Sequence, residues 1–163
     1  DVLGHLHALG HRRIVTFAPS RASTPDRPSE RVVQVWADRL GLDCRIVNSP
    51  HSLDGAKAVA LVSLALDPRP TACFCLSDSI AHGVYAACRE AGLRIPEDVA
   101  IAGYDDHPIS RLLTPPLTSV DWDVERVAET AVHFLVDVLD GGEGGRRAVV
   151  PPKLIVRGST EGA

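Results

Sequence analysis

Apolar residues follow two alternating patterns along most of the chain. Short, mostly apolar runs predict buried strands, at 12–18, 44–47, 71–76 and 99–102. Apolar residues spaced three or four positions apart predict helices, at 2–9, 30–40, 54–66 and 80–91. Regular alternation of helices and strands is typical of an α/β fold with a doubly wound parallel sheet, which is the fold class we expect.

The last third of the chain departs from this alternation. Two adjacent prolines in 114–118 exclude a helix and predict a stiff, extended connection. An amphipathic helix is expected at 123–139, followed by a glycine-rich turn and a late strand within 148–156. We therefore expect a first lobe, then a crossover and helix that belong to a neighbouring lobe, then a return strand and tail. These parts are 1–118, 119–145 and 146–163, respectively.

Polar residues follow the predicted strands at their carboxyl ends. The three segments are the loop 19–29, Ser77-Asp78 and Asp105-Asp106-His107. Ligands of open α/β sheets bind beyond the carboxyl ends of the strands, so these segments predict a cleft for a small molecule. Because Ser77-Asp78 precedes a helix, we also expect one of these two residues to cap it.

Composition narrows the function classes. Hydrophobic residues make up 45% and charged residues 23% of the 163 residues, as in ordinary globular domains. The net charge of −4 argues against binding of nucleic acid by this segment itself. The four cysteines form no CxxC pair and suit buried thiols of a cytoplasmic protein, and no apolar run is long enough for a membrane span. The chain has no Met, so we expect further sequence upstream.

Five segments in fixed order resemble the LacI/GalR family of transcriptional repressors. They span 9–14, 70–84, 95–106, 115–120 and 154–160. They include Leu9-Gly10-His11-Arg12-Arg13-Ile14 in the first, Ser77-Asp78-Ser79-Ile80-Ala81 in the second, both Ile95-Pro96-Glu97-Asp98-Val99 and Gly103-Tyr104-Asp105-Asp106 in the third, Pro115-Pro116-Leu117-Thr118 in the fourth and Arg157-Gly158-Ser159-Thr160 in the fifth. The resemblance extends over nearly the whole chain.

The resemblance implies a periplasmic-binding-protein-like core of two lobes, of which this chain holds the C-terminal one. A small effector, a sugar or related metabolite, would bind between the lobes and alter the affinity for operator DNA. The DNA would be bound by a helix-turn-helix domain that is not in this chain, and the protein would be a cytoplasmic homodimer without membrane contact. The resemblance implies no cofactor, no metal and no catalytic residue.

The same resemblance assigns ligand-binding residues. Asp105 matches the acid of the family's Gly-Tyr-Asp-Asp turn, which accepts hydrogen bonds from the effector, and Ser77 and Asp78 match its polar pair at a strand end. The family's arginine near the start of the second helix has two candidates, Arg31 and Arg27, because the surrounding motif is not intact. His51 stands, after Pro50, where many members have an aromatic residue that stacks on the effector. We expect Asp106 and His107 to be structural or peripheral.

Two tryptophans and one helix face have alternative interpretations. Trp36 is expected in the core beneath its helix rather than as a ligand platform. Trp122 fits a hinge or cleft position as well as ordinary packing. The residues of one face of the helix 80–91 either contact a second subunit or pack on the chain's own sheet; they are Ala81, Val84, Tyr85 and Cys88.

Other functions remain open from the sequence. A periplasmic sugar-binding protein of a transport system would have the same fold and is the alternative to a repressor. An enzyme is disfavoured, because the chain has no GxGxxG after a strand, no GxSxG, no P-loop and no zinc spacing. Asp105-Asp106-His107 is the one segment that could hold a general base.

Overall fold

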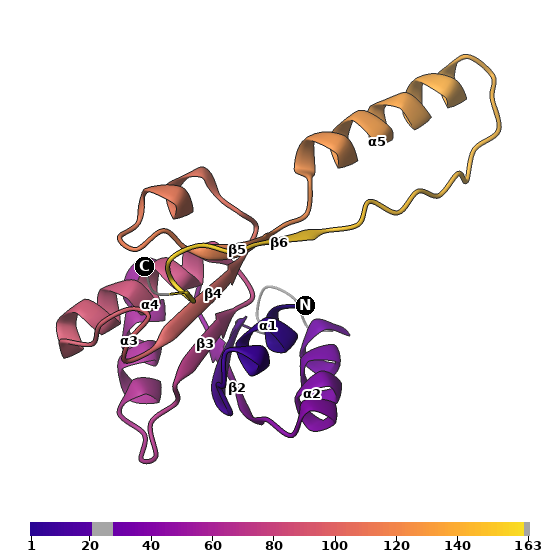
Figure 1. The fold of residues 1–163 in the computed structure, drawn as a ribbon. Helices are drawn as coiled ribbons and strands as arrows, with labels where there is room; N and C mark the ends of the chain where they lie inside the picture. Colours follow the sequence, from indigo (N-terminus) through magenta and orange to yellow (C-terminus); the bar gives the residue numbers. More distant parts are fainter. Residues whose placement is uncertain (21–27, 162–163) are drawn as a thin grey trace.

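The computed structural model describes residues 1–20 and 28–161 and forms one sheet flanked by helices (Figure 1). The strands are β1 (Arg13–Pro19), β2 (Asp43–Ser49), β3 (Ala72–Cys75), β4 (Ala100–Tyr104), β5 (Thr118–Asp121) and β6 (Lys153–Ile155). Their order is β2-β1-β3-β4-β5-β6, and only the β5–β6 pair among these strands is antiparallel. All carboxyl ends of the parallel strands therefore lie at one edge.

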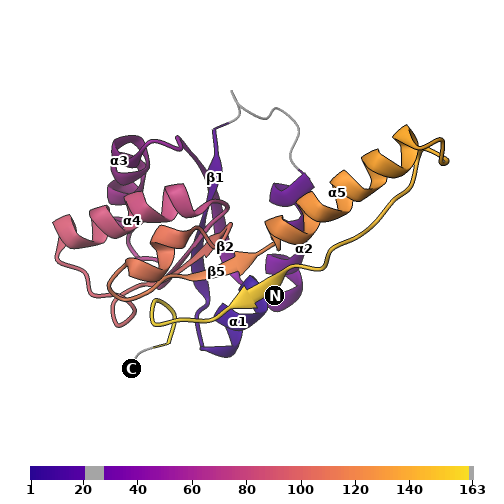
Figure 2. The ribbon, with the colours of Figure 1, turned by 90° about the horizontal axis from the view of Figure 1, so that it is seen from above.

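Helices cover both faces of the sheet, which confirms the doubly wound fold (Figure 2). One face carries α1 (Val2–Ala8) and α2 (Pro28–Leu40), and the other carries α3 (Leu53–Leu64) and α4 (Asp78–Ala91). The predicted bounds of these helices and of β1 to β4 differ from the observed ones by one or two residues. Among the described helices, none is long and apolar enough to cross a membrane.

Side chains of each strand alternate between two hydrophobic cores. Phe17, Cys73 and Ile101 point toward α3 and α4, whereas Ile14, Phe74 and Ala102 point toward α1 and α2. This alternation follows from the two-residue period of a strand, and it explains why the central runs are apolar at every position. The two cores pack on both faces of the sheet and so hold the carboxyl ends of its central strands in place.

Helix α4 packs tightly on the sheet and on α3. A Cβ atom at Gly83 would lie 2.4 Å from the Cβ of Ala56, so only glycine permits the close approach of the two helices. Ala81, Val84 and Cys88 have no solvent exposure, and Tyr85 packs against the same core. The face that could have contacted a second subunit packs on the chain's own sheet instead.

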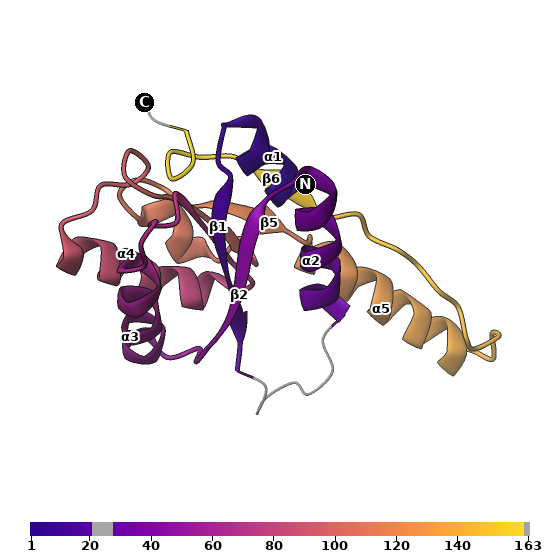
Figure 3. The same cartoon turned by 90° about the horizontal axis from the view of Figure 1, so that it is seen from below.

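Helix α5 (Val124–Leu139) extends away from the sheet (Figures 1 and 3). None of its residues 124–139 is buried, and Val132 and Leu135 are 60% and 59% exposed. The predicted amphipathic helix is confirmed, but its apolar side remains open to solvent. Buried neighbours normally provide most of the stability of such a helix, so α5 is the least supported helix of the molecule.

Three details differ from the sequence-based expectations. Residues 118–121 form β5, so the sheet extends past the limit at 118 that we expected for the first lobe; the assignment of lobes stays a prediction. A short 3₁₀ helix, η1 (Pro108–Leu112), follows β4. Trp36 is 49% exposed, because α2 turns Val33 and Ala37 toward the sheet, so its expected core position was wrong.

Candidate functional site

The predicted ligand residues follow different strands at the carboxyl edge of the sheet. Ser77 comes after β3 and begins α4, Asp105 comes directly after β4, and His51 follows β2. Arg31 lies in the first turns of α2, which follows β1 and covers the other face of the sheet. Arg27, the other candidate for the family arginine, lies outside the described residues.

Ser77 and Asp105 are joined by a hydrogen bond. The Ser77 hydroxyl donates to Asp105 Oδ2 over 3.1 Å and accepts a hydrogen bond of 3.3 Å from the backbone N–H of Ser79. The second contact is the helix cap that we predicted for this pair of residues. One serine therefore begins α4 and orients the carboxylate at the end of β4.

Asp105 is exposed although it lies in a constrained turn. Its φ of 117° falls in the region that L-residues rarely adopt. Partial burial of the carboxyl group raises its pKa, and the nearby charge of Asp78 adds to the rise. The hydroxyl of Ser77 and the charge of His51 act in the opposite direction, which places His51 near enough to influence this carboxylate.

Asp78 is buried and fully engaged with the protein. Its Oδ2 accepts hydrogen bonds from the His107 backbone N–H at 2.8 Å and from the Ser110 hydroxyl at 2.7 Å. Its Oδ1 accepts one of 2.7 Å from the Ser119 hydroxyl, and the side chain as a whole is 1% exposed. These bonds join α4, η1 and β5. The geometry shows a structural role; ligand binding by Asp78 stays an untested prediction.

Asp106 is buried in a cluster of charges. Its Oδ2 accepts a hydrogen bond of 2.8 Å from Arg111, and its Oδ1 lies 2.6 Å from Nη1 of Arg157. Burial alone would raise the pKa of Asp106, but the close contacts and positive charges of Arg157 and Arg111 outweigh it and lower the pKa. His107 is exposed and caps η1 by accepting a hydrogen bond of 3.3 Å from the Ile109 backbone N–H. Both residues have the structural contacts that we expected.

Arg31 and His51 are exposed at the rim of this edge. His51 is linked to Asp105 through its effect on the pKa of that carboxyl group, whereas the hydrogen-bonded pair does not include Arg31. Their proposed contacts with a ligand stay predictions.

A partly apolar hollow of about 330 Å³ lies between the end of β4 and α5. Aromatic side chains line it from three segments: Tyr104, Trp122 and Phe134. Of these, the sequence singled out only Trp122, as a hinge or cleft residue. Tyr104 precedes Asp105 in the same motif, which is the signal that could have placed it here, but nothing local linked Phe134 to the edge.

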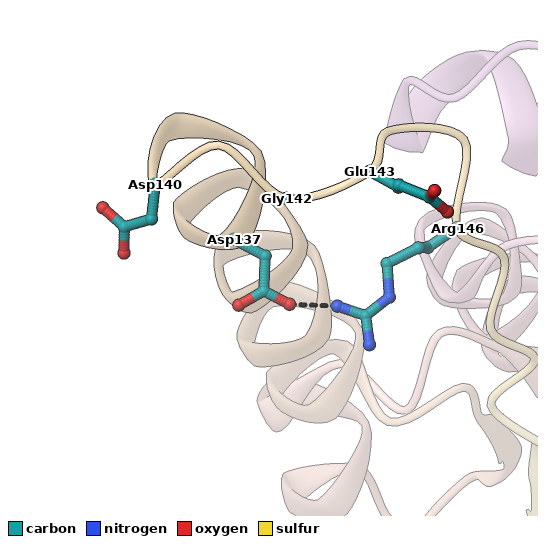
Figure 4. Close-up of a pocket in the computed structure, with 5 residues that line it drawn as sticks. All are labelled: Asp137, Asp140, Gly142, Glu143 and Arg146. Atoms are coloured by element: carbon teal, nitrogen blue, oxygen red, sulfur yellow. Dashed lines mark hydrogen bonds and ion pairs between the residues drawn. The ribbon is translucent and has the colours of Figure 1, made fainter.

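A second hollow, of about 460 Å³, lies at the far end of α5 (Figure 4). Asp137 points toward Arg146 and pairs with it, while Asp140 points to the other side. The hollow contains none of the predicted ligand residues, and its arginine is already paired. It has no described connection with the carboxyl edge of the sheet.

Sequence comparisons place the chain among regulators. Residues 3–160 match the model of the periplasmic binding protein-like domain. The lactose operon repressor of Rhizobium radiobacter is 39% identical over 60% of this chain and 87% of its own length. The chain belongs to the LacI family of transcriptional regulators. The regulator MalR of Streptomyces coelicolor is 36% identical over 98% of the chain, and this LacI-family chain spans about half (48%) of that relative's length.

Solved structures agree with the LacI-family assignment. A LacI family transcriptional regulator from Arthrobacter sp. FB24, solved in complex with lactose, superposes with a TM-score of 0.90 at 27% identity. The match covers 98% of this chain and 62% of the other. Within the LacI family this chain corresponds to the periplasmic binding protein-like domain. The relatives named here are regulators, so the alternative of a transport protein is less supported.

Proposed function

We propose that the chain is an effector-sensing lobe of a transcriptional repressor and that it binds a sugar or related polar metabolite at the carboxyl edge of its sheet. The observation that carries this proposal is the Ser77–Asp105 pair, because it presents an oriented, exposed carboxylate at the position where ligands of α/β sheets bind.

The chemistry of the pair suits ligand hydroxyl groups. An ionised carboxylate only accepts hydrogen bonds, and each bond from a ligand hydroxyl to it gains strength from the charge. The Ser77 hydroxyl donates to Asp105 Oδ2, and because Asp105 remains exposed, its carboxylate can accept further hydrogen bonds from a ligand. His51 and Arg31 would add donors from the rim, whereas we assign Asp78 to holding this edge of the sheet together.

The comparisons support a sugar as the ligand class. One relative is a lactose operon repressor, and the Arthrobacter regulator was solved in complex with lactose. In this chain the aromatic hollow lined by Tyr104, the residue before Asp105, could receive the apolar face of a ring, a role that an aromatic at position 50 or 51 would otherwise fill. The ligand itself is therefore proposed by class alone.

The rest of the protein is proposed from the family. Helix α5, which has no buried residue, would belong to the neighbouring lobe, and a helix-turn-helix domain outside this chain would bind operator DNA. We propose a cytoplasmic homodimer in which the effector prefers one arrangement of the lobes and thereby changes operator affinity. No catalytic step is proposed.

Ligand-dependent stabilisation of the full-length protein tests this function. Thermal unfolding is measured with lactose, maltose, ribose, adenosine and sorbitol, and a ligand at 100 times its Kd adds about 2.7 kcal/mol of stability. We expect one of the sugars to raise the Tm of the wild type, and Asp105→Ala to abolish the rise without unfolding the protein.

Asp54→Ala is the matched control, because Asp54 is also exposed but lies in the first turn of α3, away from the turn after β4. It should retain the full response. The proposal is overturned if none of these compounds raises the Tm, and Asp105 leaves the site if Asp105→Ala responds like the wild type.

A further inference from the structure

The turn that carries Asp105 is held from β5. The backbone N–H of Asp105 donates to the carbonyl of Val120 over 3.0 Å, and that of Asp106 donates to the Ser119 hydroxyl over 3.1 Å. Both residues have positive φ, 117° and 46°. Such a backbone is strained and persists only when its surroundings hold it.

Arg157 also contacts this turn, through Asp106. Its Nη1 donates to the Leu117 carbonyl over 2.7 Å and lies 2.6 Å from Asp106 Oδ1, and its side chain is 15% exposed. The contact with Asp106 is a charge contact, because no described donor makes an aligned hydrogen bond to Oδ1. The backbone N–H of Arg157 also donates to the Thr118 hydroxyl over 2.8 Å. Arg157 is thus held both at its guanidinium group and at its backbone.

Arg157 lies in the segment that returns to the sheet from α5. Strand β5 leads into α5, and β6 returns from it and pairs antiparallel with β5. Arg157 is the second residue after β6, so its guanidinium connects the returning segment with the turn that presents Asp105. A shift of β6 along β5 would move the guanidinium relative to Asp106.

We propose that Arg157 is a positioning residue: by binding Asp106 it sets the direction of the Asp105 carboxylate and makes that direction depend on the placement of the returning strand. The inference rests on the proposed function, in which Asp105 contacts the ligand. Arg157 does not touch the ligand itself.

Arg111 provides a matched control within the molecule. It has the same charge and contacts the same carboxylate, at Oδ2 over 2.8 Å, but it comes from η1 and is 63% exposed. It has no contact with β6 among the described interactions. Loss of Arg111 therefore weakens the charge balance at Asp106 and leaves the link to β6 in place.

Hydrogen exchange of the full-length protein tests the positioning without any ligand. We compare Arg157→Gln, Arg157→Lys and Arg111→Gln with the wild type, and the β3 peptide of each protein reports global stability. We expect Arg157→Gln to accelerate exchange in the 103–107 peptide about tenfold relative to β3. Arg157→Lys should restore part of the protection, and Arg111→Gln should stay within about twofold of the wild type.

Calorimetric titration with lactose as the probe forms the second arm. Arg157→Gln should weaken binding about tenfold and Arg111→Gln about twofold or less. If lactose does not bind the wild type, that result bears on the proposed ligand, and the exchange arm decides the positioning role.

Equal acceleration at 103–107 and at β3 would show that Arg157 only stabilises the fold and would overturn the inference. Equal effects of Arg157→Gln and Arg111→Gln would do the same. If Arg157→Gln does not fold, the exchange ratio of Arg157→Lys decides, because Lys keeps the positive charge and loses the planar guanidinium, whose Nη1 contacts both Asp106 and Leu117.

Discussion

Asp78 and Asp105 lie at the same edge of the sheet, yet their surroundings differ completely. Asp78 is 1% exposed and accepts three hydrogen bonds from other parts of the chain. Asp105 is exposed, and the Ser77 hydroxyl donates to its Oδ2. The closed side of the edge, around Asp78, ties elements together, whereas the open side, around Asp105, keeps acceptor capacity for something else.

The comparison shows how one edge serves two purposes. Replacement of a buried carboxylate that accepts several hydrogen bonds lowers the stability of the fold, because each donor would lose its partner. An exposed carboxylate in a strained turn contributes little to stability, and this agrees with the ligand contact that we propose for Asp105. Burial and hydrogen bonding, rather than residue type, separate the two roles.

Replacement of Asp78 is the strongest way to test the closed side. Asp78→Ala leaves the Ser110 and Ser119 hydroxyls and the His107 backbone N–H without their acceptor, and we expect a loss of about 3 kcal/mol in the free energy of unfolding. Urea unfolding followed by circular dichroism measures it, with Asp54→Ala as the exposed control. A loss below about 1 kcal/mol would contradict the role given to Asp78.

The strain at Asp105 predicts a smaller effect on the open side. Asp105→Gly should be more stable than Asp105→Ala by about 1–2 kcal/mol, because glycine adopts a φ of 117° without the strain that alanine retains. Both variants should lose the ligand response equally. Equal stabilities of the two in urea unfolding would show that the turn is not strained.

Acid titration gives the smallest predicted effect and has opposite signs at the two neighbouring residues. The pKa of Asp106 is lowered from 3.8, so its ionised form stabilises the fold above that pH, and this contribution is lost as the pH falls through the folded pKa. The pKa of Asp105 is raised from 3.8, so its ionisation costs stability as the pH rises through the folded pKa.

Unfolding of Asp106→Asn and Asp105→Asn at pH 7 and at pH 3 checks these signs. Asp106→Asn should be less stable than the wild type at pH 7, and the difference should shrink at pH 3. Asp105→Asn should be more stable than the wild type at pH 7, and this difference should also shrink at pH 3. Deviations of the same sign in both variants would refute the assignment of burial and charge at this turn.

Local patterns were sufficient for much of the fold. The strands β1 to β4, a cap on α4 by one residue of the Ser77-Asp78 pair and the end of α4 at Ala91 depend on neighbouring residues and were predicted. β5 was not predicted as a strand, because 118–121 follows two prolines and gains its partners from β4 and β6. Trp36 was misplaced since α2 carries two adjacent apolar stripes, and only the packing decides which of them faces the sheet.

The site depends on contacts that no local pattern contains. Asp105 and Ser77 could be placed at one edge from topology alone, and the structure adds the hydrogen bond between them. Asp78 finds Ser110 and Ser119 across 32 and 41 positions of sequence, and Asp106 meets Arg157. Partners this distant come together through the tertiary fold, so the division into a closed and an open side could not be predicted.

The pairing of β5 with β6 also determines where a segment of the chain could be removed. The chain leaves the sheet after Asp121 and re-enters at Lys153, and these two residues are direct partners in the antiparallel ladder. Residues 122–152, α5 included, are thus an insertion whose two ends already lie side by side. A two-residue turn such as Asn-Gly is long enough to join those ends, so the sheet and its carboxyl edge could be produced as a smaller module without the exposed helix.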